Sequence, residues 1–443
     1  MSTLTLVIIT VFVVGYICIA TESLLKINKA AIALLMCVFC WTLLMMAPGS
    51  FYPDVAPDGL IGHISEVIEH HLGDAAGTLF FLMGAMTIVE IVDSNGGFNF
   101  VRDALKTRSK RKLMWRVAFM TFFLSAILDN LTTSIVMIMV LRKLVQSHSE
   151  RLIYAALIVI AANSGGAFSP IGDVTTIMLW IKGVITTQGV LTEIFIPSLV
   201  SMVIPAFILQ YSLNGKFDKS QNLPKAEVTQ FTKVQRDIIF WLGVGGLVFV
   251  PIFKTITHLP PFMGILLVLG ILWTVTEIFH HNTSEDDTMA KRVSDLLSRI
   301  DLSTIMFFLG ILMAVAVLQE IGVLTRLGEG LNEAFNGNHY LVTGIIGVLS
   351  SIVDNVPLVA GCMGMYPVQP TGDMAVDGIF WQLLAYCAGV GGSMLIIGSA
   401  AGVVVMGLEK ITFGWYMKKI TWIAFVGYLA GMLCYWLERT FLF

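Results

Sequence analysis

The chain has 443 residues, of which 56% are hydrophobic and only 13% are charged, and its formal net charge is −3. This composition excludes a water-soluble protein, because many apolar runs exceed the roughly 20 residues with which a helix spans the hydrocarbon core of a bilayer. The sequence therefore predicts an all-α polytopic membrane protein, and its small net charge gives no reason to expect a nucleic-acid partner.

Ten apolar segments are predicted to cross the membrane as helices. The first apolar run, from Leu4 to Ala20, has no basic residue before it and no clear cleavage site after it, so we expect a first span and not a cleaved signal peptide. The ten crossings lie near residues 4–21, 28–47, 75–93, 152–182, 191–213, 238–254, 262–279, 303–320, 379–409 and 420–438.

Two further apolar stretches, at about 117–145 and 341–366, are too long for one straight crossing and too short for two, which need roughly 40 residues. Each has the same polar pair near its middle: Asp129-Asn130 in the first and Asp354-Asn355 in the second. A carboxylate at this depth costs about 2.5–3.5 kcal/mol, so a functional role is expected. We predict two re-entrant hairpins, whose tips are covered by protein or by a water-filled cavity.

The distribution of basic residues predicts how the chain is oriented. Six loops hold 23 of the 27 Lys and Arg residues, whereas the segment 48–74 holds none and carries five acidic residues. With ten crossings and two hairpins, all six loops fall on one side, which must be the cytoplasm. Both termini are then outside, the first hairpin opens to the cytoplasm and the second opens outward. The six loops are residues 22–29, 99–116, 142–151, 214–236, 280–300 and 410–419.

The two halves of the chain resemble each other, which predicts a first repeat at 1–226 and a second at 227–443. Three features recur at an offset of 225 or 226 residues: FFLMGAM around Gly84 and FFLGILM around Gly310, the two Asp-Asn pairs, and the pairs Gly165-Gly166 and Gly391-Gly392. Each half has five crossings and one hairpin, and since five is odd the second copy is inverted. Inverted repeats with broken helices are typical of secondary transporters, and we expect scaffold and transport domains interleaved between them.

The crossings 152–182 and 379–409 are about 30 residues long and contain the paired glycines, within residues 161–176 and 388–402. Paired glycines relax a helix, and in the first copy Pro170 also removes a backbone donor. We expect both helices to be broken at these positions. A break leaves carbonyl and amide groups free to bind an ion.

The polar residues of the two hairpins and two breaks form a candidate cation site. Hard cations such as Na⁺ or Li⁺ need oxygen ligands, some of them anionic, and neither the hairpin tips nor the breaks contain a Lys, Arg or His. The same oxygens can take H⁺ instead, so Na⁺ and H⁺ would compete. We expect no catalytic residue and no cofactor. The candidate ligands are Asp129 and Asp354 foremost, with Asn130, Thr132, Thr133, Asn163, Ser164, Asp173, Asn355 and Ser393.

Some of these residues also have a purely structural interpretation. An Asp-Asn pair can cap a helix, and Asn355 before Pro357 is typical of the start of a half-helix. For Asp173 two roles are equally expected: accepting a hydrogen bond from a backbone amide freed by the break, or binding the ion directly. Outside the site, His70-His71 is a candidate pH sensor, although histidines in loops are usually plain surface residues.

The order and spacing of these motifs resemble the ion transporter superfamily, and within it the NhaD-type sodium/proton antiporters. The resemblance covers nearly the whole chain and rests on SAILDNLTTSIVM, ANSGGAFSPIGDVTTIMLW, SSIVDNVPLVAG and AGVGGSMLIIGSAAG. It implies a homodimer with a scaffold domain at the subunit contact and a transport domain that moves like an elevator. Dicarboxylate carriers of the superfamily carry Ser-Asn-Thr at the hairpin tips, where this chain has Asp-Asn. The second break lacks the Asn-Ser of the first, which leaves direct ligation by the second half open.

Together these inferences predict a secondary transporter of a bacterial inner membrane and not an enzyme. It would exchange cytoplasmic Na⁺ or Li⁺ for external H⁺ by elevator-type alternating access, in support of pH homeostasis and salt tolerance. Its expected partners are these ions, the lipid bilayer and a second copy of the chain. Two alternatives stay open: an anion, arsenite or Na⁺-coupled dicarboxylate carrier of the same fold, and an intramembrane aspartyl protease.

Overall fold

The computed structural model describes residues 3–98, 101, 104–213, 215–217, 231–281, 293–352 and 354–441. Within these ranges the regular secondary structure is helical, apart from an isolated bridge between Ser109 and Lys216, so the prediction of an all-α protein is confirmed. Three of the predicted basic loops lie partly outside the described residues: those at 99–116, 214–236 and 280–300.

The helices follow the apolar segments of the sequence. The first half contains α1 (Thr3–Ala20), α2 (Glu22–Leu25), α3 (Lys29–Met46), η1 (Pro48–Ser50), η2 (Pro57–Gly59), α4 (Leu60–Ser94), α6 (Lys110–Leu128), α7 (Asn130–Leu144), α8 (His148–Ala167), α9 (Val174–Lys182), α10 (Thr187–Glu193), α11 (Phe195–Leu209) and η3 (Gln210–Ser212). The second half contains α12 (Lys233–Thr257), α13 (Pro261–His281), α14 (Val293–Leu297), α15 (Leu302–Glu320), α16 (Val323–Ala334), α17 (His339–Leu349), α18 (Asn355–Met365), α19 (Ile379–Gly391), α20 (Ala400–Glu409), α21 (Phe413–Lys419) and α22 (Thr421–Phe441).

Six helices of the described chain are long and apolar enough to cross a membrane, or up to seven if the bent pair α21 and α22 counts as one span. The apolar segments of the sequence predict ten crossings. The difference arises in part because some predicted crossings consist of shorter pieces: the one at 379–409 is built from α19 and α20, of 13 and 10 residues. Half-helices of this kind are tolerated in a membrane only where protein or a water-filled cavity covers their ends. The number of crossings stays a prediction.

Helix α4 is longer than the sequence analysis expects. The expected span is 75–93, whereas the helix begins at Leu60 and has 35 residues. At 1.5 Å per residue it is about 50 Å long, well beyond the roughly 30 Å of hydrocarbon. The expectation that 60–74 forms a loop is therefore wrong, and His70 and His71 are helical. Charged side chains stay hydrated where a helix continues out of the membrane, so their presence does not end it.

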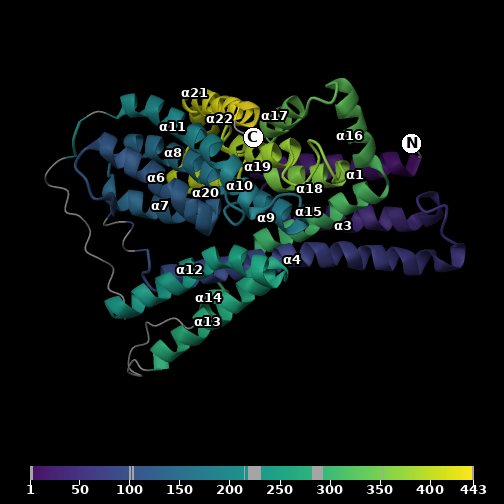
Figure 1. Cartoon of the computed structure of the whole chain (residues 1–443), viewed down its shortest axis with the longest axis horizontal. Helices are drawn as coiled ribbons and strands as arrows, with labels where there is room; N and C mark the ends of the chain where they lie inside the picture. Colours follow the sequence, from purple (N-terminus) through teal and green to yellow (C-terminus); the bar gives the residue numbers. More distant parts are fainter. Residues whose placement is uncertain are drawn as a thin grey trace.

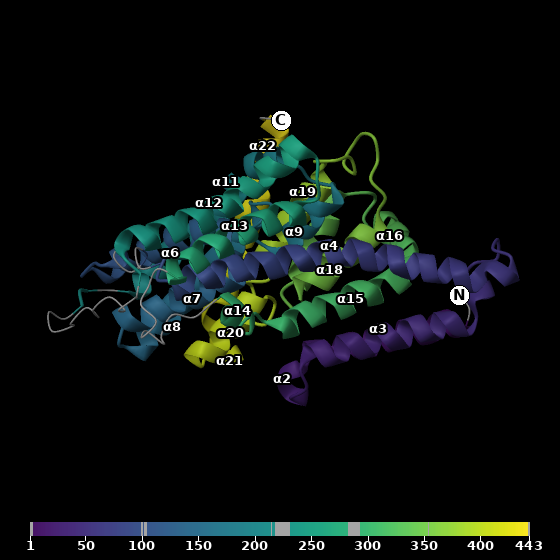
Figure 2. The ribbon, with the colours of Figure 1, turned by 90° about the horizontal axis from the view of Figure 1, so that it is seen from below.

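Helices from the two halves of the chain pack against each other. In Figure 1, α12 and α13 lie with α4 along one side of the molecule, while α6 to α9 and α17 to α22 form the other side. Helix α13 packs on α4, and α3 packs beside α15, as Figure 2 shows. Both contacts use the glycine of an FFL motif: a Cβ at Gly84 would collide with Ile265, and one at Gly310 with the backbone of Ala33.

Helices α6 and α7 form the first Asp-Asn segment, with the pair at the point where they meet. The other ends of these two helices lie near the start of α8. Lys110 begins α6 and pairs with Glu150 in the first turn of α8, with Nζ and Oε1 2.6 Å apart. Helix α7 ends at Leu144, and three residues separate it from α8. Both arms of this segment therefore reach the same face of the molecule.

Helices α17 and α18 form the second segment. Their ends away from the Asp-Asn pair lie near the chain that follows α9. His339 at the start of α17 approaches Asp373 in the connection after α18, with Nδ1 and Oδ2 2.8 Å apart. In the same connection, Asp377 N donates to Val184 O, just past α9, at 3.0 Å. Because α9 continues the path of α8 across the molecule (Figure 1), the two segments open to opposite faces.

Candidate cation-binding site

The first Asp-Asn pair lies where α6 gives way to α7. Asp129 is the single residue between the helices, and its φ of 79° and ψ of 159° form a conformation that residues other than glycine rarely adopt. Its side chain caps α7, because one carboxylate oxygen accepts from Thr132 N and the other from Thr132 Oγ1, both at 2.8 Å. Among the described residues, no basic side chain pairs with this carboxylate.

The second pair lies at the start of α18 and has a different partner. Asp354 Oδ1 accepts from Val356 N at 3.2 Å, which caps the helix. Asp354 Oδ2 accepts from Lys29 Nζ, at the first residue of α3, at 2.9 Å. The Lys29 ammonium also lies 4.3 Å from the ring centroid of Phe307. The second aspartate is therefore already paired with a cation of the protein itself.

The asparagines of both pairs meet at Asp173, which is 1% exposed. Asn130 Nδ2 donates to Asp173 Oδ2 at 2.9 Å. Asn355 Nδ2 lies 3.4 and 3.5 Å from the two oxygens of the same carboxylate. Asp173 also caps α9, since its Oδ1 accepts from Thr175 N at 3.1 Å. One buried carboxylate thus connects two segments that lie far apart in the sequence.

A chain of polar contacts extends from Asp173 into the second break. Asn130 Nδ2 also donates to Asn163 Oδ1 at 3.1 Å, and Asn163 Nδ2 donates to Ser399 Oγ at 2.9 Å. Ser399 caps α20 by accepting from Gly402 N at 3.2 Å. Ser399 is not among the predicted ligands, although it lies 226 residues after Asp173. The repeat offset is the signal that would have identified it.

The paired glycines allow the Asp-Asn segments to lie close to the interrupted helices α8 and α19. Helix α8 ends at Ala167 and α19 ends at Gly391, so both helices stop within the ranges where breaks are expected. A Cβ at Gly165 would collide with the Phe122 backbone of α6, and one at Gly391 with the Gly347 backbone of α17. Glycine therefore lets each Asp-Asn segment pack closely against the neighbouring interrupted helix.

Two predicted ligands point elsewhere. Ser164 Oγ lies 2.8 Å from Ser201 Oγ on α11, and Ser393 Oγ donates to Val390 O of its own turn at 2.6 Å. Thr133 Oγ1 is buried and has no hydrogen-bond partner among the described residues, so this oxygen is available to a ligand. The structure therefore groups Asn130, Asn163, Asp173 and Asn355 and separates the two serines from them.

The electrostatics of the site favour a cation. Four helices, α7, α9, α18 and α20, begin here, capped by Asp129, Asp173, Asp354 and Ser399. The positive ends of helix dipoles stabilise ionised carboxylates, which is the form that binds a metal ion. The site contains three carboxylates. Among the described residues, one basic side chain, that of Lys29, is in direct contact with them.

The side chains fit a hard monovalent cation. Asn130 and Asn355 present their amide NH₂ groups to Asp173, and a half-turn of each amide would present its oxygen instead. Carboxylate and amide oxygens are the ligands that such ions prefer. A proton on Asp173 would occupy the same oxygens. A cation and a proton would therefore compete for this carboxylate.

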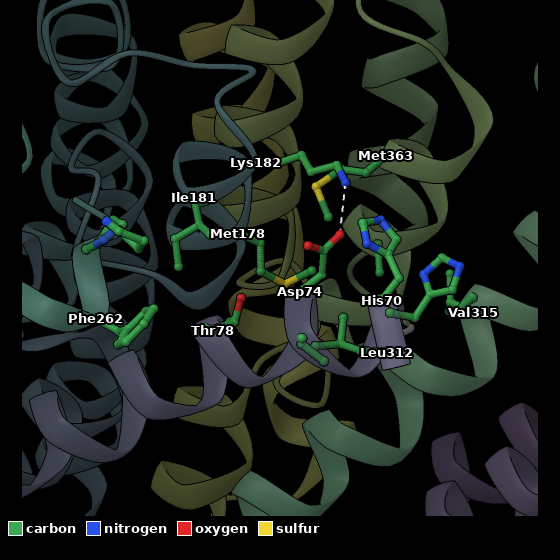
Figure 3. A pocket seen from close by; sticks show the side chains of 18 of the residues that line it. His70, Asp74, Thr78, Met178, Ile181, Lys182, Phe262, Leu312, Val315 and Met363 are labelled. Carbon is green, nitrogen blue, oxygen red and sulfur yellow. Dashed lines mark hydrogen bonds and ion pairs between the residues drawn. The ribbon is translucent and has the colours of Figure 1, made fainter. Parts of the chain in front are cut away.

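A cavity of about 790 Å³ opens between α4, α9, α15 and α18. In Figure 3, the side chains of His70, Asp74 and Thr78 on α4 lie across it from Met178 and Lys182 on α9. Lys182 Nζ lies 3.3 Å from Asp74 Oδ2, and both side chains are about half exposed. The cavity gives water access from the face of the molecule where α9 ends.

A smaller cavity lies beside the first Asp-Asn pair. It is lined by Asp129 together with apolar side chains that include Phe81 and Ile177. Phe81 lies one helical turn beyond Thr78, and Ile177 adjoins Met178, both of which line the large cavity. The small cavity therefore lies near the large one along α4 and α9, although no described residue lines both.

Comparisons with known proteins agree with this architecture. A family model described as citrate transporter matches residues 16–383. Sodium/proton antiporter 1 of Arabidopsis thaliana is 45% identical over 96% of this chain and 71% of its own length. The Na⁺/H⁺ antiporter NhaD of Alkalimonas amylolytica is 30% identical over 98% of this chain and 90% of its own. The solved YdaH transporter of Alcanivorax borkumensis superposes with a TM-score of 0.60 over 92% of this chain and 98% of that one, at 12% identity, which shows a shared fold alone.

Proposed function

The chain belongs to the citrate-transporter family and is a relative of the NhaD-type sodium/proton antiporters, and we propose that it exchanges Na⁺ or Li⁺ for H⁺ across a membrane. As a member of a transporter family it is not an enzyme, which removes the protease alternative. The observation that carries the proposal is the convergence of Asn130 and Asn355 on the buried carboxylate of Asp173.

Competition at Asp173 accounts for exchange. A Na⁺ ion binds the ionised carboxylate together with amide oxygens of Asn130 and Asn355, and the charge of Asp129, which no described basic side chain neutralises, adds to its attraction. A proton neutralises the same carboxylate and so removes the strongest ligand of the cation. The transporter then needs only to alternate the face to which the site is open.

Alternating access follows from two inverted repeats, at 1–226 and 227–443, that form a scaffold and a transport domain. Two pairs of equivalent contacts support this. The packing of α4 on α13 corresponds to that of α15 on α3. The packing of α6 on α8 corresponds to that of α17 on α19. The transport domain would contain α6 to α9 and α17 to α20, and would move like an elevator against α3, α4, α13 and α15. The large cavity between α4 and α9 lies along that boundary. A homodimer would hold the scaffolds together.

The proposed location is a bacterial inner membrane, with the basic loops in the cytoplasm and both termini outside. The basic residues Lys110, Arg142 and Arg151 support this orientation, because they gather where α6 and α8 begin and α7 ends. Proton influx would then drive Na⁺ export, which would contribute to pH homeostasis and salt tolerance. Reporter fusions at each terminus test the orientation.

Everted membrane vesicles with a pH-sensitive dye test the exchange. Adding Na⁺ or Li⁺ to acidified vesicles should release their protons, and Asp173→Asn, Asp129→Asn and Asp354→Asn should abolish that release at equal protein levels. Asp74→Asn, in an exposed pair at the large cavity, is the control that should keep it. A silent wild type, or an Asp173→Asn variant with full activity, would refute the proposal.

A dicarboxylate carrier is the second candidate, because the matching family model is described as citrate transporter. The site argues against it: Lys29 is the basic side chain that the described structure places there, and Asp354 already neutralises it. An anionic substrate would need a cationic group that is free to bind it. Sodium-dependent uptake of labelled citrate or arsenite into vesicles, above the level of empty vesicles, would favour this alternative.

A further inference from the structure

Lys29 holds the second Asp-Asn pair through a partly sheltered ion pair. Its Nζ lies 2.9 Å from Asp354 Oδ2 and 4.3 Å from the ring centroid of Phe307. The Lys29 and Asp354 side chains are only 24% and 16% exposed. A charge pair that is shielded from water in this way is screened by salt less than a surface pair is. The aromatic face adds a favourable interaction with the ammonium.

The backbone of Lys29 is anchored, so the position of the ammonium is a built feature. Lys29 N donates to Glu22 Oε1 at 3.1 Å. The preceding residue, Asn28, caps α3 by accepting from Ala30 N at 2.8 Å. Asn28 Oδ1 also accepts from Ser303 Oγ at 3.0 Å, which ties the start of α3 to the start of α15.

The ion pair and the large cavity lie at different levels along α15. Helices α3 and α15 run side by side in the same direction, since Asn28 contacts Ser303 near both starts and Trp41 Nε1 donates to Met313 O farther along. The large cavity is lined by Glu320, at the far end of α15. Along α15, the Lys29 ammonium therefore lies toward the start of the helix, and the lining of the large cavity lies toward its end.

We propose that Lys29 is a tethered cation that occupies Asp354 in this structure, and that the transported cation must displace it. The inference rests on the proposed transport of a monovalent cation. An ammonium group and Na⁺ carry the same charge and bind the same oxygens, so one carboxylate does not neutralise both. Lys29 therefore weakens cation binding at the second pair, and the described residues give Asp129 no equivalent partner.

Equilibrium binding of radioactive Na⁺ to the purified full-length protein tests this without depending on proton exchange. Lys29→Gln removes the charge and keeps a polar side chain, so the Na⁺ concentration for half-saturation should fall about fivefold. Lys29→Arg keeps the charge and should bind Na⁺ as the wild type does. Lys26→Gln, at an exposed lysine of the same segment, is the matched control and should also match the wild type.

A second variant tests the same point on protein that has already folded. Lys29→Cys is purified and then treated with an aminoethyl thiosulfonate, which restores an ammonium group, or with a methyl thiosulfonate, which does not. Half-saturation should require about fivefold more Na⁺ after the first reagent than after the second. Wild-type protein treated in parallel controls for its own six cysteines.

Several outcomes would overturn the inference. One is Na⁺ binding by Lys29→Gln, or by the neutral Lys29→Cys adduct, that is no tighter than that of the wild type. Another is a gain from Lys29→Gln that persists after Asp354→Asn has removed the partner. A wild type that binds no Na⁺ overturns both the inference and the antiport. A wild type that binds Na⁺ but releases no protons from vesicles refutes the antiport alone.

Discussion

The two Asp-Asn pairs have the same sequence but different surroundings. At the first pair, Asp129 is bound by Thr132 of its own helix and faces a small cavity with otherwise apolar lining. At the second pair, Asp354 is held by Lys29, which is 325 residues away in the chain. The asparagines, in contrast, share a partner, because both approach Asp173. The comparison teaches that the duplicated amides share a role while the duplicated carboxylates do not.

The two breaks differ in a similar way. Asp173 caps α9 and Ser399 caps α20, at positions separated by the repeat offset. The central charge therefore comes from one half only, although the surrounding helices are arranged alike. A site of this kind has one strong cation ligand at its centre, which suits the binding of one ion or one proton at a time.

The largest expected effect tests whether the central charge belongs to one half. Asp173→Asn should lower Na⁺ affinity by about 100-fold or more, because it removes the carboxylate on which both asparagines converge. Radioactive Na⁺ binding to the purified protein measures this. Unchanged affinity would place the cation elsewhere and would make the first pair, with Asp129, the main site.

A smaller effect tests whether the two asparagines are equal. Asn130→Ala should raise the half-saturating Na⁺ concentration of antiport about tenfold and Asn355→Ala about threefold. The order follows from geometry, since Asn130 lies 2.9 Å from Asp173 and also contacts Asn163, whereas Asn355 lies 3.4 Å away or more. Dye assays at varied Na⁺ measure both values, and the reverse order would contradict the expected asymmetry.

A stability measurement sharpens the contrast between the two aspartates. Asp354→Asn leaves Lys29 without its partner and should lower the free energy of unfolding by about 1 kcal/mol, a modest value because both side chains are partly exposed. Adding Lys29→Gln should recover most of that loss. Asp129→Asn should not show this rescue. Melting temperatures in detergent test the set, and a double variant less stable than Asp354→Asn would count against the pairing.

The smallest expected effect concerns the second break. Ser399→Ala removes a helix cap and the acceptor of Asn163, so it should cost about 0.5–1 kcal/mol of stability and weaken Na⁺ binding about twofold. The same binding and melting assays apply. A loss as large as that of Asp173→Asn would show that both halves contribute equally.

Much of the fold was predictable because a bilayer restricts the possible structures. Nine of the ten apolar runs became helices or interrupted helices close to the expected bounds, and both Asp-Asn pairs lie at helix starts. The exception is α4, which begins at Leu60, because hydrated side chains allow a helix to continue beyond the membrane. Ser164 and Ser393 were chosen for their oxygens, and the helix rotation that turns them away is set by packing.

The sequence by itself determined the class of protein, the helical segments and the location of the polar residues, because apolar length and the cost of a carboxylate in lipid are properties of the chain. Only the tertiary structure decided which polar groups meet. Asp173 lies at the centre because α7, α9 and α18 begin at one point, and Lys29 reaches Asp354 because α3 packs beside α15. Such contacts join residues hundreds of positions apart, and their distances depend on helix packing that no local pattern encodes.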